Sequence, residues 1–186
     1  MVLAGPSAVG KGTVIRALLA REPRLWFSVS ANTRARRPGE RDGVDYLFMS
    51  RDEFEALRDA GGFLEWFEVY GDLKGTPRAP VLEHLAAGED VLLEIDVQGA
   101  LSVREEFPDA LLVFLKAPSR EEQRRRIAAR GDADPADVER RLDAAAREEA
   151  LADRFDAVVV NAEVDAAVAE VAGILSARRA TGPRSA

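Results

Sequence analysis

A glycine-rich loop near the start of the chain limits the possible folds more than any other stretch. The loop runs from Gly5 to Thr13, after the apolar run 1–4 and before the apolar residues of a predicted helix. A strand, a glycine loop and a helix in this order are typical of a phosphate-binding loop. Gly5 and Gly10 can adopt backbone angles closed to other residues, so successive N–H groups can turn inward around a phosphate. The sequence therefore predicts a nucleotide-binding site after the first strand.

Lys11 and Gly12 determine what chemistry this loop can support. Lys11 is placed where its ammonium can reach the β- and γ-phosphates of a nucleotide, and the positive end of the following helix adds to its effect. Gly12 stands where a Ser or Thr normally contacts magnesium, and Thr13 comes one residue later. We therefore expect Mg²⁺ to be held mostly by water, phosphates and another carboxylate. The alternative is an ordinary glycine-rich turn of an α/β protein, which would not account for Lys11 in register.

The amino-acid composition limits which kinds of partner, and which cellular compartment, are expected for this chain. The 186-residue chain carries a formal net charge of −7, no cysteine and one histidine, His84. An acidic chain is not suited to broad binding of nucleic acid or anionic membranes, so we expect neither partner. Without cysteine there are no disulfides or thiolate metal sites, and no segment resembles a signal peptide or a spanning helix, so we expect a cytoplasmic protein. We interpret His84, which lies between two leucines, as structural rather than catalytic.

Strands and helices alternate over most of the chain. Strands are predicted at 1–4, 25–30, 46–49, 63–70, 91–95, 110–115 and 157–160. Helices are predicted after the glycine loop, from a capping box at 50–53 to 61, from a Thr76-Pro77 cap onward, at about 100–107, from a second capping box at 119–122, at 135–152 and at 164–175. Alternation predicts a parallel sheet covered on both faces, with the site at the carboxyl ends of its strands. The stretch 30–86 does not alternate and is interpreted as an insertion, with chain breaks at Gly71-Asp72 and Gly75.

Two groups of charged residues occur where a nucleotide would need them. The loop 32–42 carries four arginines, Arg34, Arg36, Arg37 and Arg41. Two of them, Arg34 and Arg37, can grip a phosphate dianion with forked donors. The alternative for this loop is a solvated arginine run that only keeps the protein soluble. Glu94 and Asp96 end a predicted buried strand, where acids can order hydrated magnesium. An acid at this position could instead cap the next helix.

Several ordered motifs together resemble the guanylate kinase family. They are the loop 5–13, Phe27 to Ser30, Thr33-Arg34, Arg37, Gly39-Glu40, Gly43, Asp45-Tyr46, Glu65-Trp66, Gly75-Thr76, Glu94 to Gly99, Arg130-Gly131, Arg141-Leu142 and Val160-Asn161. The resemblance covers almost the whole chain. It implies transfer of the γ-phosphoryl group of ATP to GMP, giving ADP and GDP in purine nucleotide metabolism, with Mg²⁺ as cofactor. It implies ATP and GMP as small-molecule partners, and it leaves a monomer and a homo-oligomer both open.

The resemblance also implies a fold and its division. The expected architecture is an α/β phosphate-loop protein with three layers, a parallel sheet, an inserted GMP-binding subdomain and a helical lid. The expected parts, which move against one another, are a core (1–31, 87–117 and 154–178), a GMP-binding insertion (32–86) and a lid region (118–153), followed by a frayed tail (179–186). The Lys-Gly-Thr sequence at 11–13 is the family's usual form, so Gly12 is no departure from it.

Roles for individual residues follow from matching this sequence to the family's motifs. Those implied to bind ATP are Gly5, Pro6, Ser7, Ala8, Val9, Gly10, Lys11, Gly12, Thr13 and Asn161. Those implied to act on the transferred phosphoryl group are Lys11, Arg126, Arg130 and Arg141. Those implied to bind GMP are Ser30, Arg34, Arg37, Tyr46, Glu65, Lys74, Thr76 and Asp96. Those implied to hold magnesium through water are Glu94 and Asp96. Asn161, which follows a strand, could instead be an ordinary turn residue.

Glu65 is the residue expected to read the base. Guanine presents two adjacent donors, N1–H and the exocyclic amine, for which a carboxylate is the natural acceptor. Adenine presents an acceptor at that ring nitrogen and would leave the bond unmet, at a cost of about 1–3 kcal/mol. Without the family, Glu65 would be interpreted as a surface acid of an extended segment.

One position departs from the family's pattern, and two other functions compete with the one implied. Lys74 stands where guanylate kinases usually have a tyrosine that bonds the GMP phosphate. Lys74 could meet that phosphate as a flexible cation, or turn to solvent or to Asp72. The competing functions are a kinase for another nucleoside monophosphate and a non-catalytic module that binds peptides. The intact loop, Lys11 and the lid arginines favour the enzyme, whereas Arg124 and Arg125 are expected to face solvent.

Overall fold

The computed structural model describes residues 1–69, 71–129 and 134–182, which fall into two compact units. The first unit comprises residues 1–23 and 95–186, and the second comprises residues 24–94. Among the described residues, no helix is both long and apolar enough to cross a bilayer.

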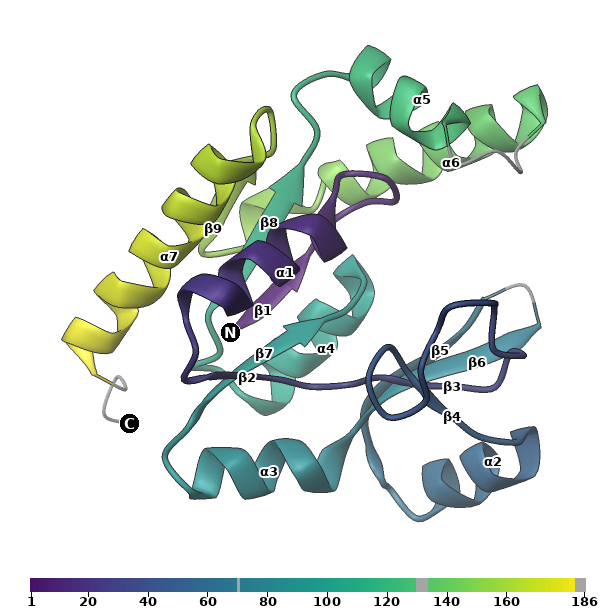
Figure 1. Cartoon of the computed structure of the whole chain (residues 1–186), viewed down its shortest axis with the longest axis vertical. Coiled ribbons are helices and arrows are strands. Elements are labelled where there is room, and N and C mark those ends of the chain that lie inside the picture. The colour runs from purple at the N-terminus through teal and green to yellow at the C-terminus, as the bar shows by residue number, and fades with distance from the viewer. Residues whose placement is uncertain (70, 130–133, 183–186) are drawn as a thin grey trace. The chain divides into compact units, whose positions relative to one another are not determined.

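Parallel strands form the centre of the first unit (Figure 1). Strand β8 (Leu112–Lys116) pairs in parallel with β1 (Val2–Ala4) and with β9 (Ala157–Val160). Helix α1 (Lys11–Arg21) packs against α7 (Val164–Thr181), while α7 also contacts β9 and α4 (Val97–Glu106) contacts β1. Every residue of 112–115 is buried, whichever side of the strand it is on. Strands β1 and β8 are therefore covered on both faces, as their uninterrupted apolar runs predict, whereas Val158 and Val160 of β9 are 40 % and 41 % exposed.

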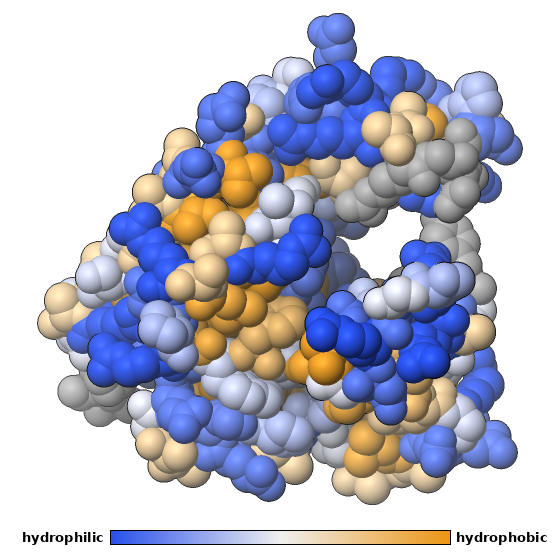
Figure 2. Space-filling view, in the orientation of Figure 1, coloured by the Kyte–Doolittle hydropathy of each residue, from blue (hydrophilic) through white to orange (hydrophobic). Residues whose placement is uncertain are grey.

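Two further helices of the first unit form most of the predicted lid region. Helix α5 (Arg120–Ala128) is capped by Ser119, and α6 (Pro135–Glu149) is capped by Asp134, as predicted. A short 3₁₀ turn, η1 (Ala152–Arg154), follows. The two helices pack around Ile127, Val138 and Leu142, and their visible surface is mainly hydrophilic (Figure 2). The large apolar residues of the two helices are therefore buried, while most of their charged residues are exposed.

The second unit contains two parallel strands and a mixed four-stranded sheet. Strand β2 (Leu25–Phe27) pairs in parallel with β7 (Asp90–Glu94). The mixed sheet has the order β4-β3-β6-β5, with bounds β3 (Ala31–Asn32), β4 (Leu47–Phe48), β5 (Phe63–Val69) and β6 (Asp72–Pro77). Strands β5 and β6 are antiparallel, as are β3 and β6, while β3 and β4 are parallel. Helices α2 (Arg51–Asp59) and α3 (Arg78–Ala86) complete the unit. The compact unit 24–94 is therefore wider than the predicted insertion 32–86, because it also includes β2 and β7.

The prediction that Gly71-Asp72 and Gly75 break the chain was right for Gly71 and wrong for Asp72 and Gly75, which lie within a strand. Residues Asp72–Pro77 form β6, which pairs along β5. Gly71 has a φ of 86°, so it makes the turn between the two strands. A Cβ on Gly75 would lie 2.9 Å from the carbonyl oxygen of Glu65, so this glycine permits close approach of the strands rather than ending one.

Some predicted boundaries also differ from the structure. Helix α3 begins after Pro77, so the Thr76-Pro77 cap was wrong, and the hydroxyl of Thr76 binds a carboxylate instead. Helix α4 begins at Val97, three residues before the predicted start, because Asp96 caps it. Residues 179–181, predicted as part of a frayed tail, continue α7, and Arg179 forms an ion pair with Glu22, which directly follows α1.

A small aromatic core stabilises the mixed sheet and α2. Phe54 of α2 is fully buried, stacks on Phe63 at a centroid distance of 4.2 Å and packs with Ala31 and Leu73. The capping box of Ser50 and Glu53 begins this helix as predicted. The cluster draws on α2, β3, β5 and β6, so it holds together the strands that carry Glu65, Lys74 and Thr76.

We predict that Phe54→Ala destabilises the protein by about 3–5 kcal/mol, because the lost ring leaves a cavity in this core. The measurement is urea unfolding followed by circular dichroism. Leu82→Ala is the control, since Leu82 of α3 is 39 % exposed and its loss should cost far less. Equal destabilisation by the two substitutions would contradict the assignment of this core.

Candidate active site

The loop between β1 and α1 has the backbone that its glycines predict. Gly5 has a φ of 151° and Gly10 a φ of 93°, and a Cβ on Gly5 would lie 2.1 Å from the carbonyl oxygen of Leu115. Ala8 has a φ of 64°, which is costly for a residue with a side chain. Its methyl group is buried with Ile127 and Leu142. Packing from α5 and α6 thus holds the loop in a conformation that the chain alone disfavours.

Lys11 folds its side chain back over this loop. Its Nζ donates to the carbonyl oxygen of Gly5 at 2.5 Å and to that of Pro6 at 3.1 Å. Helix α1 begins at Lys11 behind Gly10, which offers no side-chain cap. The first N–H groups of α1 therefore receive no capping side chain from the residue that precedes them, as an anion site at a helix start requires.

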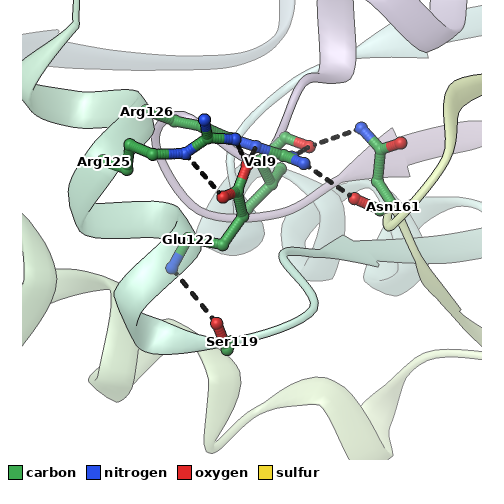
Figure 3. A network of polar contacts seen from close by, with 6 residues as sticks. All are labelled: Val9, Ser119, Glu122, Arg125, Arg126 and Asn161. Carbon is green, nitrogen blue, oxygen red and sulfur yellow. Dashed lines mark hydrogen bonds and ion pairs between the residues drawn. The ribbon is translucent and has the colours of Figure 1, made fainter.

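Arg126 and Asn161 converge on the loop from α5 and from the end of β9 (Figure 3). Arg126 donates from Nη1 to the carbonyl oxygen of Val9 at 3.3 Å and from Nη2 to that of Asn161 at 3.1 Å. The side-chain Nδ2 of Asn161 donates to the same Val9 oxygen at 2.8 Å. Asn161 is only 2 % exposed, so it is not an ordinary turn residue, and within the described chain its Oδ1 has no hydrogen-bond partner.

Glu122 orients Arg126 in this network. Its Oε1 accepts from Nε of Arg126 at 2.7 Å, and both its oxygens accept from Arg125. These bonds, first from Arg125 and then from Arg126, lower the pKa of Glu122 to about 2. Ser119 accepts from the backbone N of Glu122, but the reciprocal bond of the predicted capping box is not found in the described residues. The carboxylate binds arginine instead of completing the box.

Arg130 and Arg141 are the other two arginines predicted to act from the lid, and Arg124 and Arg125 were predicted to face solvent. Nε of Arg141 lies 2.8 Å from Oδ2 of Asp137, one turn earlier on α6. Arg130 lies outside the described residues. Arg124, predicted to face solvent, is half-exposed and pairs with Glu139, and Arg125 is the most exposed of the helix's ion-paired arginines.

Asp96 is a helix cap, the alternative that the sequence left open. Its Oδ1 accepts from the backbone N of Gly99 at 2.6 Å, and α4 begins behind it. Glu94 is the last residue of β7 and is half-buried. No group of three or more acids, histidines or cysteines suited to a metal occurs within the described ranges.

Glu65 lies inside the second unit. It is 7 % exposed, and its Oε1 accepts from the hydroxyl of Thr76 at 2.5 Å across the β5–β6 pair. The interpretation as a surface acid was therefore wrong. Ser30, also predicted for this site, is 9 % exposed in the same unit. A carboxylate is desolvated at a cost unless donors surround it, so its burial indicates a site built to receive donors.

The arginine loop is divided between one half-buried arginine, Arg34, and three exposed ones. Arg34 is 16 % exposed at its side chain, so a purely solubilising role was wrong for it, whereas Arg36, Arg37 and Arg41 are exposed. The Cζ of Arg34 lies 5.0 Å from the ring centre of Tyr46. The hydrogen bonds to Glu40 chiefly raise the pKa of Arg34, against the effect of burial.

Lys74 belongs to the same cluster. Its Nζ lies 5.4 Å from the ring centre of Tyr46, so the cation approaches the aromatic face. No ion pair between Lys74 and Asp72 is found in the part of the chain that the structure describes. Three groups predicted to bind one phosphate, Arg34, Tyr46 and Lys74, are thus neighbours in the structure.

Known proteins agree with these features. The family model described as Guanylate kinase matches residues 1–178. The chain belongs to the guanylate kinase family. It is 53 % identical to the guanylate kinase of Nocardia farcinica over 94 % of this chain and 91 % of that protein, and 52 % identical to that of Symbiobacterium thermophilum over 100 % and 88 %. Among solved structures, the guanylate kinase of Anaplasma phagocytophilum matches with a TM-score of 0.78 and 34 % identity, over 95 % of this chain and 83 % of that one.

Sequence reasoning missed two residues of this guanylate kinase chain that contact or surround the loop. Gln123, 2 % exposed, donates from Nε2 to the carbonyl oxygen of Ser7 at 2.9 Å, and nothing in an arginine-rich helix distinguished it. Glu148 is half-buried on α6, and burial chiefly raises its pKa, with Lys11 opposing and Asp96 adding to the shift. Its spacing of three from buried Ala145 could have placed it on the inner face of the helix.

We predict that Gly10→Ala and Gly12→Ala have opposite effects on stability. A Cβ on Gly10 would lie 2.4 Å from Nδ2 of Asn161 at a positive φ, whereas one on Gly12 would meet nothing within 4 Å. Gly10→Ala should lower the free energy of unfolding by about 1–3 kcal/mol, and Gly12→Ala, within α1, should raise it by about 0.5–1 kcal/mol. Denaturant unfolding measures both. If Gly10→Ala and Gly12→Ala had equal free energies of unfolding, the loop would not depend on a glycine with a positive φ at position 10.

Proposed function

We propose that this chain transfers the γ-phosphoryl group of ATP to GMP, producing ADP and GDP in purine nucleotide metabolism. The observation that carries the proposal is the buried Glu65, whose carboxylate is held by Thr76 at 2.5 Å inside the second unit. Guanine offers an N1–H and an amine from which a buried carboxylate can accept hydrogen bonds, whereas adenine presents an acceptor at that ring nitrogen. Ser30, Thr76 and Asp96 complete the proposed base and sugar contacts. Membership of the guanylate kinase family supports the same reaction.

The phosphate of GMP is assigned to the cluster around Tyr46. Arg34 and Arg37 offer forked donors, Tyr46 offers a hydroxyl, and Lys74 offers a cation where relatives of this family usually have a tyrosine. The position of Lys74 near the Tyr46 ring supports this assignment over one in which Lys74 binds Asp72.

The ATP site is assigned to the first unit. Residues Gly5 to Thr13 would surround the phosphates with backbone N–H groups, and Lys11 would exchange its two carbonyl partners for phosphate oxygens. Arg126, Arg141 and Arg130 would stabilise charge on the transferred group. The Oδ1 of Asn161, buried beside the loop, fits an acceptor for the amine of adenine. Phosphoryl transfer needs positioning and charge stabilisation more than covalent chemistry from the protein, which suits this set of groups.

Magnesium is the proposed cofactor, and Glu94 and Asp96 are the residues that would hold it through water. When bound with ATP, the ion neutralises charge between the phosphates. Asp96 has already committed one oxygen to Gly99, which leaves its other oxygen for a water ligand. We also propose that the core, the insertion 32–86 and the lid 118–153 move as separate parts during turnover.

The decisive test is ADP release with ATP and each of GMP, AMP, UMP and TMP, for the native chain and for Glu65→Gln. The native chain should turn over with GMP alone. Glu65→Gln should lower the ratio of GMP to AMP efficiency by about 5–150-fold, the equivalent of one unmet buried hydrogen bond. Glu68→Gln, on the same strand but exposed, is the matched control. An unchanged ratio in Glu65→Gln would exclude Glu65 as the base reader.

A second prediction concerns Lys74. Lys74→Ala should raise KM for GMP several-fold at low ionic strength and less at high ionic strength, because a tethered exposed cation is screened by salt. Lys74→Tyr should restore tight binding with a weaker salt dependence. Arg41→Ala is the control, since Arg41 is an exposed cation that pairs with Asp45. If KM for GMP in Lys74→Ala equals that of the native chain at every salt concentration, Lys74 does not contact the phosphate.

A further inference from the structure

Glu40 has no role in the site described so far, yet it makes the tightest polar contacts of the arginine loop. Its Oε1 accepts from Nη2 of Arg34 at 2.5 Å, and its Oε2 accepts from Nη1 of Arg34 at 2.7 Å. The same Oε2 accepts from the backbone N of Arg37 at 2.8 Å. One carboxylate therefore binds the side chain of one proposed phosphate-binding arginine and the backbone of the other.

The contacts with Glu40 use a defined part of the Arg34 guanidinium. Nη1 donates to Glu40 and to the carbonyl oxygen of Ala35 at 3.0 Å, which uses both of its N–H groups. Nη2 donates one N–H to Glu40. Within the described residues, the bonds to Glu40 and Ala35 thus use three of the five N–H donors. They do not use Nε–H or the second N–H of Nη2, which share the other edge of the planar group. That edge has the spacing of a fork that a phosphate can bind with two oxygens. The Tyr46 side chain also interacts with the Arg34 guanidinium.

Two aromatic rings beside Arg34 fix the plane of its guanidinium, in addition to the edge that Glu40 binds. Its Cζ lies 5.0 Å from the ring centre of Tyr46 and 5.5 Å from that of Phe48. The pKa of Glu40 is lowered to about 2, first by Arg34 and then by the backbone N of Arg37, so the carboxylate is ionised at neutral pH. An ionised acid removes net charge from the arginine, so its benefit to phosphate binding must come from orientation rather than attraction.

We propose that Glu40 is a positioning residue for GMP: it holds the Nη1–Nη2 edge of Arg34 so that the Nε–Nη2 edge is presented to the phosphate. The inference rests on the proposed function, because it takes Arg34 as a phosphate-binding residue. An arginine side chain has several rotatable bonds, and fixing it before the ligand arrives removes an entropy cost from binding. The hydrogen bond from the backbone N of Arg37 to Glu40 also fixes the position of the Arg37 backbone relative to Arg34.

The test compares Glu40→Gln with Asp45→Asn. Asp45 is the matched control, because it binds the backbone N of Arg41 at 2.8 Å and pairs with the side chain of that arginine in the same loop. We expect Glu40→Gln to raise KM for GMP by about tenfold, as for a weakened charge-assisted hydrogen bond, with KM for ATP unchanged. The dissociation constants of GMP and guanosine give a second readout, because guanosine has no phosphate. The constant for guanosine should not change in Glu40→Gln, and Asp45→Asn should change neither constant.

Three results would overturn the inference. A lower KM for GMP in Glu40→Gln would mean that the acid competes with the phosphate for Arg34. Equal weakening of GMP and guanosine would mean that Glu40 only maintains the loop, and thermal unfolding of the variant would then show a matching loss. An unchanged KM for GMP would mean that Arg34 needs no support.

Arg34→Ala separates failure of this inference from failure of the proposed function. If Arg34→Ala leaves KM for GMP unchanged, the phosphate site itself is wrongly assigned. If Arg34→Ala raises KM and Glu40→Gln does not, only the positioning role falls. In the Arg34→Ala background, Glu40→Gln should add no further change to KM, because a positioning residue acts through the group that it positions.

Discussion

The outward carbonyl groups of the phosphate loop are the constraint on which the candidate ATP site depends. A loop whose N–H groups turn toward a ligand must turn carbonyl oxygens elsewhere, and each needs a donor. Here Lys11 binds those of Gly5 and Pro6, Gln123 binds that of Ser7, and Asn161 and Arg126 bind that of Val9. These donors come from α1, α5 and the end of β9, so three elements far apart in sequence determine the shape of one loop.

This arrangement connects packing to chemistry. Ala8 holds a strained positive φ because its methyl group packs with residues of α5 and α6, and the same helices carry Gln123 and Arg126. A change in those helices would therefore alter the loop's backbone as well as the side chains above it. The strain at Ala8 is maintained by the surrounding structure rather than by the local sequence.

Most of the fold could be predicted because its signals are local. Caps at Ser50, Ser119 and Asp134, and apolar runs at 91–95 and 110–115, placed helices and strands within a few residues. The hairpin of β5 and β6 could not be predicted from Gly71 and Gly75, because a glycine that ends a strand and one that lets two strands approach look alike in sequence.

Predicting the site from sequence had a similar limit. Glu65 and Thr76 were named through the family's motifs, but the bond between them depends on the register of two strands. Glu40 occurs in one of the family's motifs, but its sequence position does not reveal which edge of Arg34 it binds. Gln123 and Glu148 carried no pattern that separates them from the other polar residues of their helices. Spacing can indicate which residues share a helix face, but not which carbonyl oxygen lies opposite.

Acidic partners of the arginines explain how a chain with a net charge of −7 can still select phosphates. Arg34, Arg126 and Arg141, each assigned to a phosphate, are paired with Glu40, Glu122 and Asp137 respectively. Each of these ion pairs carries little net charge, so its electrostatic field alone does not attract every anion to the site. A ligand gains from these arginines only if its oxygens match the donors that the acids leave available, since bidentate bonds depend on geometry. Selectivity for a nucleotide phosphate then follows from the orientation of each guanidinium, and the acids that reduce the local charge are the groups that set that orientation.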